Sequence, residues 1–274
     1  YILPKLPPIL VEESRKSKKT INLEQDIEKK NSQMAERILA DAKDRLMHFG
    51  FTQKTVEAAF FNINIGVARD ICSWAEKNKK ADAIFISSRG RSRLKAFFTG
   101  EIANKVLEYV KVCPVWLVKG RVKHNNVLLA VENSENAMRA VDHAAFLLSG
   151  TDVTVTVFHS KRDLRRFVPK EVLQEFPGVQ KFWQKKAGAV VAPYMKKAHT
   201  KLIQAGIAEN RISVKMVNGS HSAAKDILDE AEENAIGTVI LGRKGHSNVE
   251  EYALGSITKK VLNGAADMTV CIVP

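Results

Sequence analysis

Residues 239–262 read VILGRKGHSNVEEYALGSITKKVL, a short apolar run followed by a glycine-punctuated loop and the beginning of a helix. Glycines occupy positions 242, 245 and 255, and Ser256 follows the last of them. Glycine permits positive φ angles and close approach of the backbone to an anion, and a helix N-terminus attracts phosphate. The spacing therefore predicts a phosphate-binding loop. The alternative is that the glycines only end a strand, form a turn and relieve crowding between helix and sheet.

An internal repeat organises the chain. Residues 82–118 align with residues 238–273 at an offset of 155, give or take the end residue, and residues 68–71 align with residues 224–227 at an offset of 156. Both copies alternate short apolar strands with helices, which is typical of a doubly wound α/β fold with a parallel sheet. We therefore predict two tandem modules, at residues 1–120 and 125–274.

The second module has the complete pattern. We expect strands at 127–132, 153–159, 212–217, 238–241 and 269–273, and helices at 135–148, 181–206, 222–234 and 256–262, with Ser134 capping the first helix. The first module has helices expected at 23–49, 67–78 and 101–109 and strands at 56–63, 83–86 and 115–118. Counterparts of the opening strand, the first helix and the second strand are missing. We interpret residues 1–8 as the connection after that missing second strand, and we expect the natural polypeptide to extend upstream.

The pattern G-x2-G-x9-G-S after the fourth strand of the second module resembles the ATP-binding signature of the universal stress protein family. This resemblance implies tandem five-stranded modules of the adenine nucleotide alpha hydrolase-like fold, the first without its opening strands. It also implies that the second module binds an adenine nucleotide, ATP, ADP or AMP, with Mg²⁺ as an optional companion. The binding residues that it implies are Ala130, Val131, Glu132, Ser160, Leu241, Gly242, Gly245, Gly255, Ser256 and Ile257.

Each part of this implied site has an expected role. Glu132 stands where the family usually has Asp beside the base or ribose, and Ser160, after His159, lies near the base. Backbone N–H groups of residues 242–245 and 255–257 would hold the phosphates, and the Ser256 hydroxyl would also cap its helix. Glu132 is alternatively a plain surface residue. Arg243, Lys244 and His246 either supply charge to the phosphates or face water.

The first module carries an altered copy of the motif. Ser87 replaces the first glycine, and Glu101 follows Gly100 where Ser256 follows Gly255. A carboxylate beside phosphates is repelled by about 1 kcal/mol in water, and by about 4 kcal/mol at an intermediate dielectric. We therefore predict that the first module binds no nucleotide. Its loop residues Arg89, Arg91, Arg93 and Lys95 either attract another anion or form a solvated basic loop.

Composition limits the classes of protein. The chain has 274 residues, is 45% hydrophobic, and has neither an apolar run of the roughly 18 residues that cross a bilayer nor a signal sequence, so we expect a cytoplasmic protein and no membrane. Three scattered cysteines indicate no disulfide framework and no thiolate metal site. The net charge is +13, with 24 Lys and Arg against 14 Asp and Glu in residues 1–124. Because no recognition motif accompanies this charge, we do not expect nucleic acid as a partner.

Nothing in the sequence provides catalytic machinery. There is no Walker loop, no nucleophile elbow and no His, Cys or Glu pairing at metal-ligand spacing, so we assign no catalytic or metal residue. The preferred function is a stress-response regulator that binds nucleotide without efficient turnover. The alternatives are a slow ATPase and an interaction module that acts through its basic first half. The resemblance implies that strands 115–118 and 270–273 pair as an intrachain pseudo-dimer, with a homodimer as a further assembly.

Overall fold

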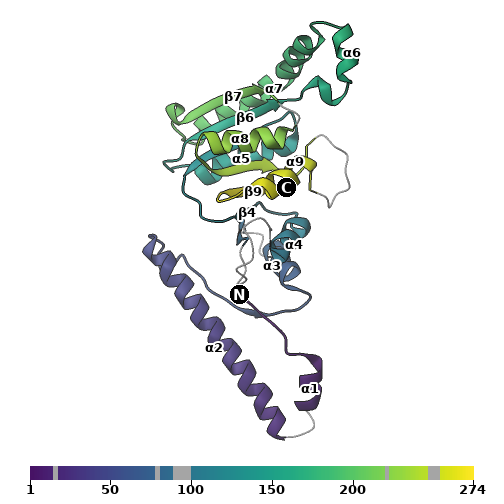
Figure 1. Cartoon of the computed structure of the whole chain (residues 1–274). Coiled ribbons are helices and arrows are strands. Elements are labelled where there is room, and N and C mark those ends of the chain that lie inside the picture. The colour runs from purple at the N-terminus through teal and green to yellow at the C-terminus, as the bar shows by residue number, and fades with distance from the viewer. Residues whose placement is uncertain (15–17, 78–80, 89–99, 220–221, 246–253) are drawn as a thin grey trace. The chain divides into compact units, whose positions relative to one another are not determined.

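The computed structural model describes residues 1–274 except 15–17, 78–80, 89–99, 220–221 and 246–253, and the side chains of residues 18–20. The described chain divides into two compact units, residues 1–70 and 71–274. Figure 1 labels many of the helices and strands of these units.

The first unit consists of two short strands and helical segments. These are β1 (Ile2–Leu3), α1 (Pro8–Ser14), α2 (Lys18–His48), β2 (Phe61–Asn62) and the first turn of α3 (Val67–Lys77), which continues into the second unit. β1 and β2 pair in parallel, with Leu3 opposite Asn62. The interpretation of residues 1–8 as a plain connection was therefore wrong. α1 was not predicted, α2 begins at Lys18 instead of the expected residue 23, and the strand expected at 56–63 is limited to two residues.

The second unit is built on a seven-stranded sheet in the order β3-β4-β9-β8-β5-β6-β7. Its strands are β3 (Ile84–Ser87), β4 (Val115–Val118), β5 (Asn126–Ala130), β6 (Val155–Lys161), β7 (Ile212–Asn218), β8 (Ile236–Gly242) and β9 (Thr269–Val273). Strands β5 to β9 form the parallel five-stranded arrangement expected of the second module. They are rich in Val, Ile and Leu because both faces of a parallel sheet are covered by helices.

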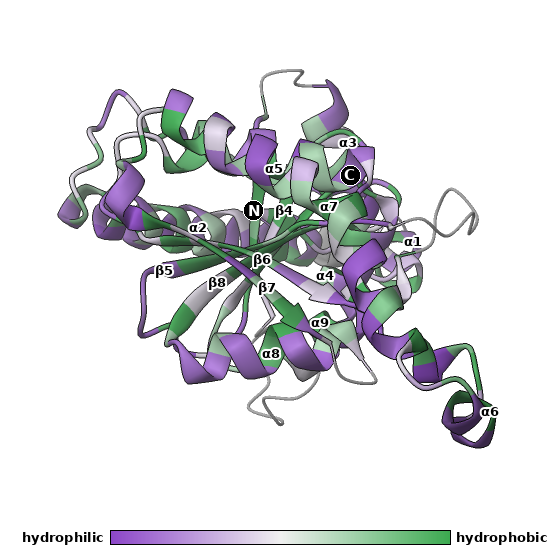
Figure 2. Cartoon of the chain, turned by 90° about the horizontal axis from the view of Figure 1, so that it is seen from above, coloured by the Kyte–Doolittle hydropathy of each residue, from purple (hydrophilic) through white to green (hydrophobic). Residues whose placement is uncertain are grey.

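Helices cover the two faces of this sheet. α5 (Glu135–Leu148) and α7 (Val179–Gln204) lie on one side, and α8 (Ala223–Glu233) and α9 (Ser256–Gly264) lie on the other (Figure 2). The shared core beneath α5 and α7 includes Leu129, Val141 and Leu202, none of which is exposed. α5 has the predicted bounds, and the Ser134 side chain caps it by accepting a hydrogen bond from the Ala137 amide. The doubly wound α/β prediction is confirmed.

Two segments between β6 and α7 were missed. The 3-10 helix η1 (Leu164–Arg166) and α6 (Lys170–Glu175) form in a stretch that the sequence marked only as basic and proline-containing. A further 3-10 helix, η2 (Glu209–Arg211), leads into β7. Because η1 follows directly from β6, it fixes where the next side chains lie at the carboxyl edge of the sheet.

The pairing of the two last strands is confirmed. β4 and β9 are antiparallel neighbours, with Trp116 opposite Cys271 and Leu117 opposite Val270. Trp116 also stacks on Phe85, with 5.3 Å between ring centroids, and its indole N–H donates to His143 Nε2 on α5 at 2.9 Å. A single sheet therefore joins the last strand of the first sequence repeat to the last strand of the second.

Candidate functional site

A cavity of about 300 Å³ lies at the carboxyl ends of β5, β6 and β8. β5 is flanked by β6 on one side and by β8 on the other, so the chain leaves β5 at the point where the strand order reverses. Ligands of open α/β sheets bind at such points. The structure brings all ten residues of the sequence-based site to this cavity: Ala130, Val131, Glu132, Ser160, Leu241, Gly242, Gly245, Gly255, Ser256 and Ile257. Their contact with a ligand stays a prediction.

Close packing against backbone atoms requires two of the three motif glycines, Gly242 and Gly255. A Cβ on Gly242 would lie 2.9 Å from the backbone carbon of Asn136, and one on Gly255 would lie 3.2 Å from the carbonyl oxygen of Arg243. None of the three has a positive φ angle, so the expectation that they supply left-handed backbone was wrong. Close approach explains them, because any side chain would separate the loop from the first turn of α5 or from the start of α9.

The backbone of Gly245 lies directly against the carboxylate of Glu132. A Cβ on Gly245 would lie 2.6 Å from Glu132 Oε1 and 3.0 Å from Oε2. The Ser134 hydroxyl donates to the same Oε1 at 3.1 Å, which holds the carboxylate on this side. Glu132 is the one acidic residue among the described residues that line the cavity. The Glu132 side chain is longer than that of the Asp usual in the family pattern. It therefore reaches the glycine loop, beyond the base or ribose side that the pattern implies.

The start of α9 differs from the expected capping arrangement. Gly255 is the N-cap residue and Ser256 is the first residue of the helix, so the predicted Ser256 cap was wrong. The amides of Ser256 and Ile257 have no carbonyl four residues earlier within the helix, which leaves their donors directed at the cavity end. The Gly255 and Arg243 amides instead donate to Arg243 O at 2.9 Å and Val273 O at 2.7 Å. Fewer loop amides are therefore available than the sequence suggested.

Thr258 is a cavity residue that the sequence reasoning missed. It is 3% exposed, and its hydroxyl lies 3.1 Å from Gly242 O and 3.2 Å from Arg243 O. These contacts join α9 to the end of β8 and fix the spacing between the first and last motif glycines. A threonine two residues after the motif serine was the only signal in the sequence.

Arg243 does not belong to the cavity. It is 6% exposed, and its guanidinium donates to Val110 O at 2.6 Å and Glu108 O at 2.8 Å, at the carboxyl end of α4 (Glu101–Tyr109). A cation at that end of a helix is favoured by the helix dipole. The suggestion that Arg243 supplies charge to phosphates was therefore wrong. Lys244 does line the cavity, and its carbonyl accepts from Asn136 Nδ2 at 3.1 Å. His246 lies outside the described residues.

The β6 side of the cavity is held by two side-chain contacts. His159 Nδ1 lies 2.7 Å from Val131 O, and a carbonyl only accepts, so Nδ1 carries the proton. Burial lowers the pKa of His159, and its bond to Val131 partly opposes this shift. The hydroxyl of Ser160 donates to Asp226 on α8. Ser160 thus lies at the cavity as expected, with its proton already committed.

Two arginines on this side were missed. Arg162 follows the last residue of β6, Arg166 ends η1, and both line the cavity. The available signal was the basic run at residues 161–166, which contains four cations immediately after a strand.

The altered motif of the first module keeps part of the local geometry. Gly100 is the N-cap of α4, and a Cβ there would lie 3.1 Å from Ser88 O, which parallels the contact of Gly255 with Arg243 O. Glu101 forms an exposed ion pair with Lys105 at 2.6 Å. Residues 89–99, with the four basic loop residues, lie outside the described chain. The absence of nucleotide binding in this module stays a prediction.

Comparison with known proteins identifies the family. A model of the universal stress protein family matches residues 11–119 and again residues 123–274. The chain belongs to the universal stress protein family. Universal stress protein YxiE of Bacillus subtilis (strain 168) is 23% identical over 146 residues, which are 50% of this chain and 90% of that protein.

Solved universal stress proteins share the fold. One from Archaeoglobus fulgidus DSM 4304 has a TM-score of 0.60 at 21% identity and covers 99% of this chain and 85% of its own. A protein described as a putative universal stress protein, from Pseudomonas aeruginosa UCBPP-PA14, has a TM-score of 0.52 at 15% identity, covering 87% and 78%. At these identities the likeness establishes the fold.

No described helix is both long and apolar enough to cross a membrane. Likewise, the described positions contain no group of three or more His, Cys, Asp or Glu side chains placed to hold a metal ion.

Proposed function

We propose that this universal stress protein binds an adenine nucleotide in the cavity between β5, β6 and β8, and that binding regulates a stress response without efficient turnover. The observation that carries the proposal is the convergence of all ten sequence-predicted residues on one cavity at the strand-order reversal. The three glycines leave the loop backbone at that cavity without side chains, and a bare backbone can approach a phosphate closely.

The chain's own groups divide the cavity by chemistry. The amides of Ser256 and Ile257 and the positive end of the α9 dipole face the phosphate side, together with Lys244. A helix terminus contributes about 0.3–1 kcal/mol per charge, so the amides and Lys244 must act together. Val131 and Phe158 supply apolar surface for the base.

Glu132 determines how a companion cation would fit. Its carboxylate lies beside Gly245, on the side where the phosphates are placed. Two like charges 4 Å apart repel by about 4 kcal/mol at an effective dielectric of 20. Mg²⁺ is usually bound by one or two carboxylates plus substrate phosphates, so Glu132 is the residue that would hold it, where it would neutralise this repulsion.

The same feature favours slow ATP hydrolysis as the second candidate function. Hydrolysis needs a metal-holding carboxylate and a group that orients water. Glu132 fits the first role, but the cavity residues include no second carboxylate for the other role. We therefore place ATP binding first and hydrolysis second. The homodimer and the cytoplasmic location stay predictions, to be checked by light scattering and by fractionation.

Calorimetric titration of the full chain with ATP and Mg²⁺ tests the proposal. We expect binding by the native protein and at least a tenfold loss in Gly245→Val, because the added methyl groups enter the cavity beside Glu132. Gly66→Ala is the matched control, since nothing lies within 4 Å of its Cβ position. Absence of ATP binding by the native protein, or equal affinity in Gly245→Val, would refute the proposal. Phosphate release that is lost in Glu132→Gln would favour the slow ATPase.

A further inference from the structure

Arg162 and Arg166 place positive charge at the end of the cavity opposite the glycine loop. Both line the cavity, and both are exposed. In the described part of the chain, neither guanidinium makes a hydrogen bond or an ion pair, whereas the neighbouring Arg165 pairs with Asp163. Arg162 and Arg166 are therefore available to a ligand, whereas Arg165 is held by Asp163.

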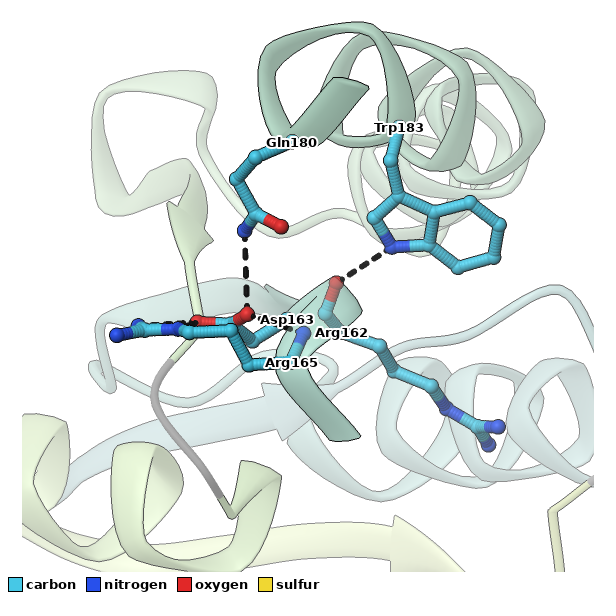
Figure 3. A network of polar contacts seen from close by, with 5 residues as sticks. All are labelled: Arg162, Asp163, Arg165, Gln180 and Trp183. Carbon is cyan, nitrogen blue, oxygen red and sulfur yellow. Dashed lines mark hydrogen bonds and ion pairs between the residues drawn. The ribbon is translucent and has the colours of Figure 1, made fainter. Parts of the chain in front are cut away.

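The backbone that carries Arg162 is anchored from behind. Asp163 is 2% exposed, and its carboxylate accepts from the Arg165 amide at 2.8 Å, the Arg165 side chain and Gln180 Nε2 at 3.2 Å (Figure 3). Trp183 Nε1 donates to Arg162 O at 2.8 Å. Figure 3 shows the Arg162 side chain extending away from this network. Because the segment is already ordered, a ligand that meets Arg162 loses less free energy to ordering than it would on a free loop.

The surrounding charges favour an anion at this end. The Glu132 carboxylate lies on the other side, beside Gly245. Asp163 is paired with Arg165, and Asp226 accepts a hydrogen bond from Ser160. The remaining ionisable groups here are Lys161 at the end of β6 and His159, whose pKa is lowered by burial. Glu132 apart, the described residues that line the cavity include no carboxylate.

The two ends of the cavity are separated by the width of β5. β8 and β6 are both neighbours of β5, and adjacent strands lie about 4.8 Å apart, so the strand ends lie about 10 Å apart. One end offers the α9 amides and Lys244, and the other offers Arg162 and Arg166. A nucleotide with phosphates only on its 5′ side would satisfy the first end and leave both guanidinium groups without an anion.

We propose that Arg162 and Arg166 form a second anion subsite, and that the cavity prefers a nucleoside bisphosphate, whose ribose carries a 2′- or 3′-phosphate in addition to the 5′-phosphate. This inference rests on the proposed function, since it assumes that the 5′-phosphate occupies the glycine loop. Phosphate is the matching group because a guanidinium binds it through two parallel N–H···O bonds.

The test compares AMP with adenosine 3′,5′-bisphosphate and adenosine 2′,5′-bisphosphate by calorimetry on the full chain. We expect at least one bisphosphate to bind about tenfold or more tightly than AMP, the effect of one hydrogen bond to a charged group. Arg162→Gln combined with Arg166→Gln should remove this preference and leave AMP affinity within about twofold. Lys170→Gln, which removes a charge from the same basic segment away from the cavity, should retain it.

The outcomes separate the two proposals. If AMP binds but neither bisphosphate binds more tightly, the second subsite is refuted and the nucleotide-binding proposal stands. A preference that persists in the double arginine variant, or that disappears equally in Lys170→Gln, also refutes the subsite. If the native protein binds none of the three ligands, the nucleotide-binding proposal fails and the subsite fails with it. A preference for one bisphosphate over the other supports the subsite and identifies the ribose oxygen.

Discussion

Gly242 should be the motif glycine on which folding depends most. In Gly242→Ala the new methyl group would lie 2.9 Å from the Asn136 backbone carbon and 3.0 Å from its carbonyl oxygen. Carbon atoms in optimal contact are about 3.5–4.0 Å apart, so the first turn of α5 must move by about half an ångström or more. Backbone cannot yield as a side-chain end can, and such overpacking costs about 1–3 kcal/mol.

A smaller effect opposes this cost. Alanine restricts the unfolded chain and so stabilises by about 0.4–1 kcal/mol where φ suits it, as it does at Gly242. The net prediction is a loss of about 0.5–2 kcal/mol. Each kcal/mol lowers the Tm of a chain of this size by roughly 2–4 °C, so the Tm should fall by about 1–8 °C.

Thermal unfolding followed by far-UV circular dichroism measures this change. Gly245→Ala is the matched control, because its methyl group meets only the mobile end of the Glu132 side chain and should change stability by less than about 0.5 kcal/mol. Equal destabilisation by the two substitutions, or an unchanged Tm in Gly242→Ala, would refute the idea that Gly242 serves packing whereas Gly245 serves the ligand.

Three further predictions concern single side chains. Burial lowers the pKa of His143 in the folded chain, so as the pH falls the unfolded chain takes up this proton first. The contribution of His143 to the free energy of unfolding should therefore be constant above about pH 6.5 and fall as the pH drops through the folded-state pKa. In urea unfolding, His143→Gln, which can still accept from Trp116, should reduce that fall. In EDTA, Glu132→Gln should bind ATP about tenfold or more tightly than the native protein, and its ATP affinity should depend less on Mg²⁺. If the ratio of ATP affinities with and without Mg²⁺ were the same in both proteins, the placement of Glu132 would be contradicted. Arg243→Gln should lower the free energy of unfolding by about 1–3 kcal/mol, because the carbonyls of Glu108 and Val110 lose charged donors. Denaturation in urea measures this change, and an unchanged free energy of unfolding would show that the two hydrogen bonds are unimportant.

The fold was largely readable from the sequence because local and long-range signals agree in the second module. α5 combines helical periodicity with a serine cap, and both its bounds and the Ser134 cap were predicted. The strands β4 and β9 were predicted with their bounds from their apolar runs, and their pairing was predicted from the resemblance to the universal stress protein family. η1 and α6 were missed because their basic, proline-containing sequence has no apolar periodicity, and tertiary bonds such as that of Trp183 to Arg162 stabilise them.

The errors at the site have a common physical cause. Spacing places a residue at a strand end or a helix start, but it does not show which groups that residue will meet. Arg243 was expected either to supply charge to the phosphates or to face water, because it stands between two motif glycines, whereas its partners are carbonyls more than 130 positions away in sequence. The positive φ expected at the glycines was wrong for the same reason, since the constraint comes from Asn136 and from Glu132.

The altered first repeat contributes to the second through direct contacts. β4 extends the sheet beside β9, Trp116 enters the core beneath α5, and the carbonyls at the end of α4 hold Arg243, the residue directly after Gly242. A residue of the first repeat is also a donor: buried Lys119, which follows β4, donates a hydrogen bond to Leu262 O near the carboxyl end of α9. Both cations lie where the helix dipole favours them. The glycine loop and the helix that would face the phosphates are thus fixed partly by residues 101–119, so this segment can lose its own motif and still be required for the geometry of the cavity.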